Sequence, residues 1–540
     1  MTLPDEIARP GLNDLVFAIC AFAFLYTQLF QLPFTPIYFD GDVMIPVTDA
    51  MRMLDGQTIY RDFFQFVTPG TEVVYAFLFS VFGAKVYVIN TVILLLGMAQ
   101  VGLIWFFSRK LLTGYAVFLP ATIFLTVGFR LFGIDGSYRI FSSVFGLAAV
   151  AVVMRAQTHR NLMIAGFLCG VSSFFGQQRG VLVVGAILSF LLSRHISSGF
   201  QLRKCFIDGV SISAAFLLTI LATQSYFVWQ AGIDNYYLSV FAFVAEHYRH
   251  DPMNRLSAYM SEIPAFHIYM AGNSILSTAF SYLRANFATY FYYLLIPPIY
   301  VIFLIWRWLT GSATLDKARN EVLWLLWFSG IFLAIGVAAP TAGRLYQIAI
   351  PGLVILVFLL SRVNLFVRVS PVVLSLLAVL GCSYVLQRQI TSKYSLQMPA
   401  GECSFLNESA YSRYKWIGEN TRPGDLLYEA HHPDFYFPFQ LKNPTRMSLI
   451  RDNEYTPQSQ VDSVVLALKQ TRPKYIVWPD GWSKDADKRQ AGDHLESLSA
   501  FIQQKYRKLN VFQMEPSVSP TDHDTFDVWQ LSDERTDTTY

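Results

Sequence analysis

Two aspartates near the start of the chain have the residue type and position that best suit proton transfer. The segment 39–70 carries five aspartates, and Asp40 and Asp42 come directly after the first long apolar run. A carboxylate at the end of a membrane-spanning helix stays charged at the water boundary, while apolar neighbours raise its basicity. We therefore predict that Asp42 is a general base, with Asp40 as its alternate. The other three are expected to be surface carboxylates of a solvated loop: Asp49, Asp55 and Asp62.

Arginines at the ends of later apolar runs could bind a phosphate group, because a guanidinium contacts two phosphate oxygens at once. The candidates at predicted outer ends are Arg130, Arg139, Arg179 and Arg344. Arg344 is the strongest candidate, because Gly343 permits close approach of a ligand and Tyr346 lies nearby in sequence. Each of the other arginines has the alternative of extending its charge to the lipid headgroups.

Residues that could hold a metal ion are few, and the sequence leaves the metal dependence open. Asp135, on the next predicted outer loop, could orient an acceptor or share a divalent cation with the first outer segment, or it could cap the following helix. Glu246 and His250 have the i, i+4 spacing of metal ligands on a helix. Two such residues in a polar loop are expected to be structural, as is the stretch HHPD at 431–434.

The composition is that of a polytopic membrane protein. Hydrophobic residues make up 54% of the 540 positions and charged residues 15%, and the mean hydropathy is +0.38. The net charge of +3 is small and the basic residues are scattered through short loops, which argues against a nucleic-acid partner. Eleven apolar runs suit a membrane crossing: 14–34, 86–107, 112–129, 139–154, 161–176, 180–193, 207–229, 287–309, 321–339, 345–361 and 369–388.

Lysine and arginine concentrate in alternate loops, which sets the predicted orientation. Short cytoplasmic loops retain basic residues, whereas translocated loops do not. One set of short connections is rich in them, with Arg109, Lys110, Arg203 and Lys204 as examples. We predict a cytoplasmic N-terminus and, from the odd number of spans, an extracytoplasmic C-terminal region. The short loops and few cysteines suggest a bacterial inner membrane.

The chain changes character at about residue 390. We predict a transmembrane domain over 1–390, with outer segments at 35–85 and 230–286, followed by an extracytoplasmic α/β domain over 391–540. The expected strands of that domain are 425–430, 474–479 and 525–531, and the expected helices are 461–471 and 494–509.

The first outer segment contains an ordered set of residues: Asp42, Ala50, Gly56, Tyr60, Arg61, Asp62, Pro69 and Gly70. This order resembles the first outer loop of polytopic GT-C glycosyltransferases, in particular the branch of dolichyl-phosphate-mannose protein mannosyltransferases and bacterial lipid A aminoarabinose transferases. The stretches 133–139, 160–180 and 343–351 occupy places where that family has comparable segments. The resemblance covers most of residues 10–390, and the tail is similar to the small extracytoplasmic domain of many relatives.

The resemblance implies a multispanning enzyme that takes a sugar from a polyprenyl-phosphate carrier and transfers it, with inversion, to a lipid, glycan or protein acceptor on the outer side. Two departures matter: Val67 stands where relatives often have lysine, and Gln347 where they often have histidine. The alternatives are a non-catalytic polyprenyl-lipid-binding scaffold and a lipid-linked sugar transporter or flippase. A transporter would place ionisable residues at mid-span, whereas here they gather at the outer rim.

Overall fold

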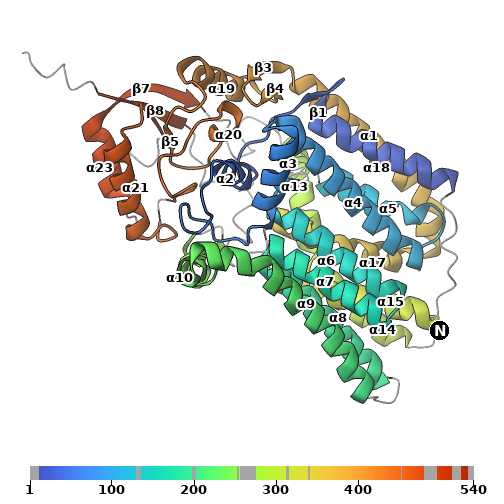
Figure 1. Ribbon diagram of the computed structural model, residues 1–540. Helices are drawn as coiled ribbons and strands as arrows, with labels where there is room; N and C mark the ends of the chain where they lie inside the picture. The colour runs from blue at the N-terminus through green and yellow to red at the C-terminus, as the bar shows by residue number, and fades with distance from the viewer. Residues whose placement is uncertain are drawn as a thin grey trace, which may run out of the picture. The chain divides into compact units, whose positions relative to one another are not determined.

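Two compact units make up the protein in the computed structural model (Figure 1). A helical unit comprises Met1–Gln28, Val92–Tyr226 and Leu256–Gln387, and a mixed unit comprises Leu29–Thr91, Phe227–Arg255 and Arg388–Tyr540. The structure describes residues 11–128, 135–197, 202–251, 254–255, 275–311, 315–337, 341–451, 453–479, 495–513 and 525–532.

Long apolar helices form the helical unit, and several of them continue for a few residues beyond its bounds. In chain order these helices are α1 (Leu12–Leu29), α4 (Val86–Leu111), α5 (Leu119–Gly128), α6 (Tyr138–Arg155), α7 (His159–Phe175), α8 (Gln177–Ser197), α9 (Leu202–Ala231), α13 (Ile275–Leu295), α14 (Pro298–Thr310), α15 (Lys317–Ile335), α16 (Ala342–Ile348), α17 (Ile350–Ser361) and α18 (Asn364–Thr391). A 3-10 turn, η1 (Gly114–Val117), precedes α5.

The predicted class, a polytopic helical membrane protein, is confirmed, but the predicted count of eleven spans is not. Within the described residues, seven helices are long and apolar enough to cross a membrane. Two bent helix pairs, α13 with α14 and α16 with α17, raise the number to nine if each pair is one span. The remaining two predicted runs fall on α5 and α7, which have only 10 and 17 residues, shorter than the roughly 20 that a crossing requires.

Small residues allow the helices of this unit to pack closely. A Cβ added to Gly166 of α7 would lie 2.2 Å from the backbone oxygen of Ile212 in α9, and one added to Gly180 of α8 would lie 2.0 Å from that of Cys169. Membrane helices associate through such close backbone approaches, because lipid offers no hydrophobic driving force between them.

The mixed unit contains all the strands of the described chain, together with further helices. Its first segment holds β1 (Phe30–Gln31), β2 (Thr35–Pro36), α2 (Met44–Leu54) and α3 (Gly70–Phe82), and its second holds α10 (Ile233–Tyr237), η2 (Leu238–Ala242), α11 (Phe243–Glu246) and η3 (Tyr248–His250). The third holds β3 (Tyr394–Met398), β4 (Gly401–Phe405), α19 (Glu408–Asn420), β5 (Leu427–Glu429), α20 (Tyr436–Phe439), α21 (Gln458–Thr471), β6 (Tyr475–Pro479), α23 (Glu496–Lys505), β7 (Tyr506–Gln513) and β8 (Thr525–Leu531).

A four-stranded sheet of order β5-β6-β8-β7 organises the C-terminal segment (Figure 1). Strands β5 and β6 are parallel, with α21 in the crossover between them, and the other two pairings are antiparallel. The apolar faces of α21 and α23 cover the sheet around the buried Trp478, Val464 and Leu498. The predicted α/β character is therefore confirmed, although the helix expected over 494–509 ends at Lys505 and continues as β7.

Candidate functional site

Asp40 and Asp42 lie at the beginning of α2, where both side chains are exposed. Asp42 comes directly before the N-cap residue Val43, and Gly41 between the two aspartates has φ +85°. Glycine adopts this left-handed conformation without steric cost. The partial positive charge of a helix N-terminus favours carboxylates in this position. The other face of α2 anchors the helix by burying apolar residues such as Val47 and Ala50.

The C-terminal segment of the mixed unit holds this pair of aspartates from two directions. Arg413 of α19 donates from Nη2 to Asp40 Oδ2 over 3.1 Å. The Gly41 amide donates to Asp434 Oδ1 over 2.7 Å, and the Tyr38 hydroxyl donates to the Asp434 carbonyl over 2.8 Å. We call residues 38–48 the reactive segment of the predicted site. Residues nearly 400 positions away in the sequence hold this segment.

The carboxylates of this cluster are electrostatically unequal. Burial, reinforced by the negative charges of Asp40 and Asp42, raises the pKa of Asp434 to about 7, against the lowering effects of the Gly41 amide and Arg413. Burial and the charge of Asp434 hold the pKa of Glu429, at the end of β5, well above its ordinary range. The cluster can therefore store a proton near neutral pH, beside the exposed Asp42.

A second pair of carboxylates in the first segment is buried, which corrects the expectation that Asp49 is a solvated surface residue. The Gln65 amide donates to Asp49 Oδ2 over 3.0 Å and to Glu72 Oε1 over 3.1 Å, and the Ser448 hydroxyl donates to Asp49 Oδ1 over 2.8 Å. Burial raises the pKa of Asp49 to about 6 and that of Glu72 to about 8. Asp55 is exposed, and Asp62 is half-buried in an ion pair with Arg61.

The predicted phosphate-binding residues lie in the helical unit, on α6, α8 and α16. Arg179 at the start of α8 is not available as a ligand-binding cation, because its guanidinium contacts the Arg139 carbonyl and the Ser143 hydroxyl and donates to Gln347 Oε1 over 3.1 Å. The guanidinium of Arg139 lies over the Tyr138 ring at 5.0 Å. Gln347 thus binds Arg179.

Arg344 and Tyr346 lie on α16 with Gln347, so this short helix carries most of the predicted phosphate site. Arg344 is half-buried, whereas Tyr346 is fully buried and stacks on Phe124 with ring centroids 4.7 Å apart. Tyr346 is therefore a packing residue, and Arg344 stays the best candidate for contact with phosphate. Arg130 lies outside the described residues.

Asp135 closes a turn just before α6 and does not itself cap the helix, which one interpretation of the sequence had expected. Its Oδ1 accepts from the Ser137 amide over 3.0 Å and from the Ser137 hydroxyl over 2.6 Å, and Ser137 is the N-cap residue of α6. Among the residues that the structure describes, no group of three or more His, Cys, Asp or Glu side chains is arranged to hold a metal ion. A role for Asp135 in acceptor orientation stays a prediction.

The two histidine-containing stretches of the sequence both contact the segment around Arg451 and Glu454 in the mixed unit. His250 Nδ1 lies 2.5 Å from Glu454 Oε2, and Arg451 lies 3.5 Å from Asp251 Oδ2 and 2.8 Å from His431 Nε2. These contacts join η3 to the turn that follows β5. Through Arg451, the 431–434 turn is therefore connected to the residue that ends η3.

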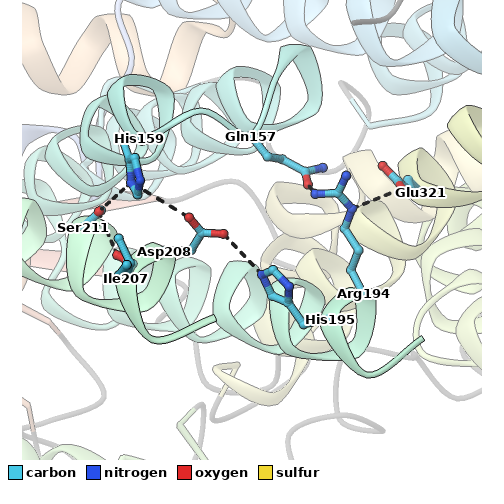
Figure 2. A network of polar contacts seen from close by, with 8 residues as sticks. All are labelled: Gln157, His159, Arg194, His195, Ile207, Asp208, Ser211 and Glu321. Atoms are coloured by element: carbon cyan, nitrogen blue, oxygen red, sulfur yellow. Dashed lines mark hydrogen bonds and ion pairs between the residues drawn. The ribbon is translucent and has the colours of Figure 1, made fainter. Parts of the chain in front are cut away.

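A separate polar network in the helical unit ties helix ends together (Figure 2). His195 of α8 lies 3.2 Å from Asp208 of α9, which also faces His159 of α7 at 3.9 Å. The neighbouring Arg194 pairs with Glu321 of α15 over 3.1 Å and contacts Gln157. The orientation predicted from the sequence assigns the loops near this network to the cytoplasm, which stays a prediction.

No protein-family model and no curated sequence matches the chain. Among solved structures, ArnT from Cupriavidus metallidurans bound to undecaprenyl phosphate aligns with a TM-score of 0.54, over 95% of this chain and 97% of that one, at 14% sequence identity. The chain has the fold of ArnT. An Archaeoglobus fulgidus oligosaccharyltransferase tethered with an acceptor peptide aligns with a TM-score of 0.49 at 12% identity, over 96% of this chain and 74% of that one.

The alignment with ArnT confirms the predicted GT-C fold. Because it covers 97% of ArnT, both the helices and the C-terminal segment of this chain take part in the likeness. The sequence had indicated the fold through the order of weak motifs in the first outer segment. The contribution of Arg413 and Asp434 had no local signal, because HHPD resembles an ordinary turn and Arg413 lies in an unremarkable amphipathic helix.

Proposed function

We propose that the protein is a membrane glycosyltransferase. It takes a sugar from a polyprenyl-phosphate-linked donor and transfers it, with inversion, to a lipid, glycan or protein acceptor on the extracytoplasmic side. The observation that carries the proposal is the exposed carboxylate of Asp42 at the start of α2, in a segment held by Arg413 and Asp434. The ArnT fold, seen in a protein crystallised with undecaprenyl phosphate, supports a polyprenyl carrier.

The proposed reaction needs a base at the acceptor and positive charge at the leaving group. The acceptor hydroxyl oxygen bonds to the anomeric carbon as the bond from that carbon to the phosphate oxygen breaks. The hydroxyl proton moves to the Asp42 carboxylate, and polyprenyl phosphate leaves with the bonding electrons. Asp40 is less suited to accept the proton, because Arg413 already neutralises it.

Replacing Asp42 tests the proposal directly. Asp42→Asn keeps the size of the side chain but cannot accept a proton, so transfer should fall by about 10²–10⁴-fold. The assay follows radiolabel from sugars of metabolically labelled source membranes into acceptor products, with the variant protein in nanodiscs. Asp55→Asn is the matched control, because Asp55 is an exposed residue at the other end of α2. Full activity of the Asp42 variant would refute the assignment.

Arg344 is proposed to bind the donor phosphate, and its removal should weaken binding of undecaprenyl phosphate. Loss of a hydrogen bond between charged groups costs about 1.5–3 kcal/mol, so Arg344→Ala should raise the dissociation constant by roughly 10–150-fold. Arg344→Lys should restore part of the affinity, since lysine keeps the charge without the bidentate geometry. Arg362→Ala, at an exposed position beyond α17, should bind as the wild type does. Equal affinity of the Arg344→Ala protein would remove Arg344 from the site.

The scaffold alternative draws support from Val67, which replaces the lysine often present in relatives. A scaffold would bind undecaprenyl phosphate but transfer no sugar in the wild-type protein. The same preparations therefore separate the two functions: transfer that depends on Asp42 supports the enzyme, and binding without any transfer supports the scaffold.

A further inference from the structure

The turn that follows β5 is attached to the reactive segment through three hydrogen bonds. Asp434 Oδ1 accepts from the Gly41 amide, the Asp434 carbonyl accepts from the Tyr38 hydroxyl, and the Pro433 carbonyl accepts from the Thr48 hydroxyl over 3.3 Å. The acceptors of these bonds all belong to the turn. The C-terminal region thus determines how the first outer segment is presented.

We propose that Asp434 is a positioning residue for sugar transfer: by accepting the Gly41 amide, it fixes the peptide that joins Asp40 to Asp42 and so directs the Asp42 carboxylate. This inference rests on the proposed function of Asp42. The geometry gives the reason. Gly41 has φ +85°, and a glycine at such a turn has wide conformational freedom, so its peptide keeps one orientation only if a fixed acceptor holds it.

Asp434 is itself held by rigid structure. Its turn begins at the carboxyl end of β5, which is parallel to β6, and the carboxyl ends of parallel strands are where α/β sheets place functional groups. Glu429 Oε2 accepts from the Phe435 amide over 3.1 Å, and the Glu429 amide donates to the Tyr436 hydroxyl over 2.9 Å. These bonds fix the backbone on both sides of Asp434.

Charge gives Asp434 a second effect on the reactive segment. The titratable and charged groups that face it are Asp40 and Asp42 from the first segment, Arg413 and Tyr414 from α19, Glu429 from β5, and Tyr38. An ionised Asp434 repels the carboxylates of Asp40 and Asp42, and this repulsion ends when Asp434 takes up a proton at pH values below about 7. Asp434→Asn retains an oxygen acceptor for the Gly41 amide but loses the charge, whereas Asp434→Ala loses both. Comparing the two variants therefore separates the effect of the hydrogen bond from the effect of the charge.

Hydrogen exchange of the Gly41 amide tests the positioning contact without a substrate. In full-length protein in nanodiscs, Asp434→Ala should speed this exchange by about 10–100-fold, and Asp434→Asn should speed it less. Asp462→Asn is the matched control, because Asp462 is an exposed residue of α21 whose side chain accepts from Gln458. Unchanged exchange in the Asp434→Ala protein would overturn the proposal.

Transfer kinetics test the consequence, with radiolabelled source membranes as the probe. Asp434→Ala should lower kcat by about 10–100-fold with little change in KM for the donor, since a small misplacement of a reacting group has this effect. Asp434→Asn should lower kcat less than Asp434→Ala does, because it retains an oxygen acceptor for the Gly41 amide. Asp462→Asn should leave the rate unchanged.

A double variant shows whether Asp434 acts through Gly41. Gly41→Ala strains the same peptide, because residue 41 has φ +85°, a conformation that alanine rarely adopts. The added Cβ would meet no atom within 4 Å, so the effect of this substitution is conformational. Two changes at one contact should not add, so Gly41→Ala with Asp434→Ala should be about as slow as the slower single variant. Additive losses would overturn the proposed route.

The outcomes distinguish this inference from the proposed function. An active Asp42→Asn protein refutes the function whatever Asp434 does. An inactive Asp42→Asn protein, together with wild-type kcat and exchange in Asp434→Ala, refutes the positioning role alone. If Asp434→Ala does not fold, the Asp434→Asn protein decides, because its neutral oxygen should still weaken the contact, and wild-type Gly41 exchange together with wild-type kcat in that protein overturns the proposal.

Discussion

Asp40 and Asp42 at the start of α2 differ from Asp49 and Glu72 on the same stretch of chain in exposure and in partners. The first two side chains are exposed; Arg413 pairs with Asp40, and Asp434 accepts from the Gly41 amide between them. The second two are buried on either side of the Gln65 amide, and burial raises the pKa of both.

We expect this difference to distinguish the proposed reactive carboxylates from carboxylates that serve packing. An exposed carboxylate at a helix N-terminus can approach an acceptor and exchange a proton with it, at little cost to the fold. A buried carboxylate is costly when ionised and is tolerated only with hydrogen-bond partners. Changes at the buried pair should therefore alter stability, whereas changes at the exposed pair should alter activity.

The largest effect on stability is expected from the cation beside the buried pair. Arg52 is buried, donates to the Thr445 carbonyl over 3.0 Å and lies over the Phe63 ring, and its charge lowers the pKa of Asp49. Arg52→Met should lower the free energy of unfolding by about 2–3 kcal/mol, because it leaves the buried Thr445 carbonyl without its donor and removes a charge that favours ionised Asp49. Chemical unfolding of the protein in nanodiscs provides the measurement.

Arg61→Met is the control for that experiment, since Arg61 is exposed and pairs only at the surface with Asp62. Its effect should be below about 1 kcal/mol. Equal effects of the two variants would mean that the buried carboxylates do not depend on Arg52, and the comparison between the two pairs would lose its basis.

A smaller effect, with a defined pH dependence, is expected at Glu72. Its pKa is raised from the ordinary 4.5 to about 8, so the folded protein binds a proton there that the unfolded chain releases. Stability from this residue is therefore lost as pH rises from about 4.5 to 8. Glu72→Gln should be nearly neutral at pH 5 and stabilising, on the order of 2 kcal/mol, at pH 8.

Unfolding at the two pH values checks this prediction, with the exposed Glu419→Gln of α19 as the control. The Glu419 variant should show the same small difference at both values. A Glu72→Gln protein that is less stable than the wild type at pH 8 would show that the buried carboxylate is needed in its charged form, and would place Glu72 beside Asp42 as a functional residue.

Periodicity and length predicted most of the fold, because apolar runs and short strands are local features. Each of the eleven predicted runs overlaps a helix, and β5, β6 and β8 lie where alternating residues indicated them. The exceptions depended on tertiary structure. Strand β7 was missed because its pairing with β8 decides the conformation after Lys505, and α5 and α7 were too short to count as spans.

The candidate site was less predictable, because its supporting residues come from distant segments. The order of motifs in 39–70 pointed to Asp40 and Asp42, but 373 positions separate Asp40 from Arg413 and 393 separate Gly41 from Asp434. Nothing in the local sequence distinguished Asp49 from its solvated neighbours. Its burial follows from the amphipathic face of α2 meeting Ser448, which only the folded chain brings together.

Azide as an acceptor tests the central claim, that Asp42 acts as a general base. Azide attacks an anomeric carbon without losing a proton, so it needs no base, whereas a hydroxyl acceptor does. With Asp42→Ala protein in nanodiscs and radiolabelled polyprenyl-phosphate sugars from source membranes, we predict that transfer to hydroxyl acceptors falls by about 10²–10⁴-fold. Azide should restore turnover and yield a glycosyl azide of inverted configuration. Retained hydroxyl transfer, or failure of azide to restore turnover while undecaprenyl phosphate still binds, would contradict the assignment of Asp42.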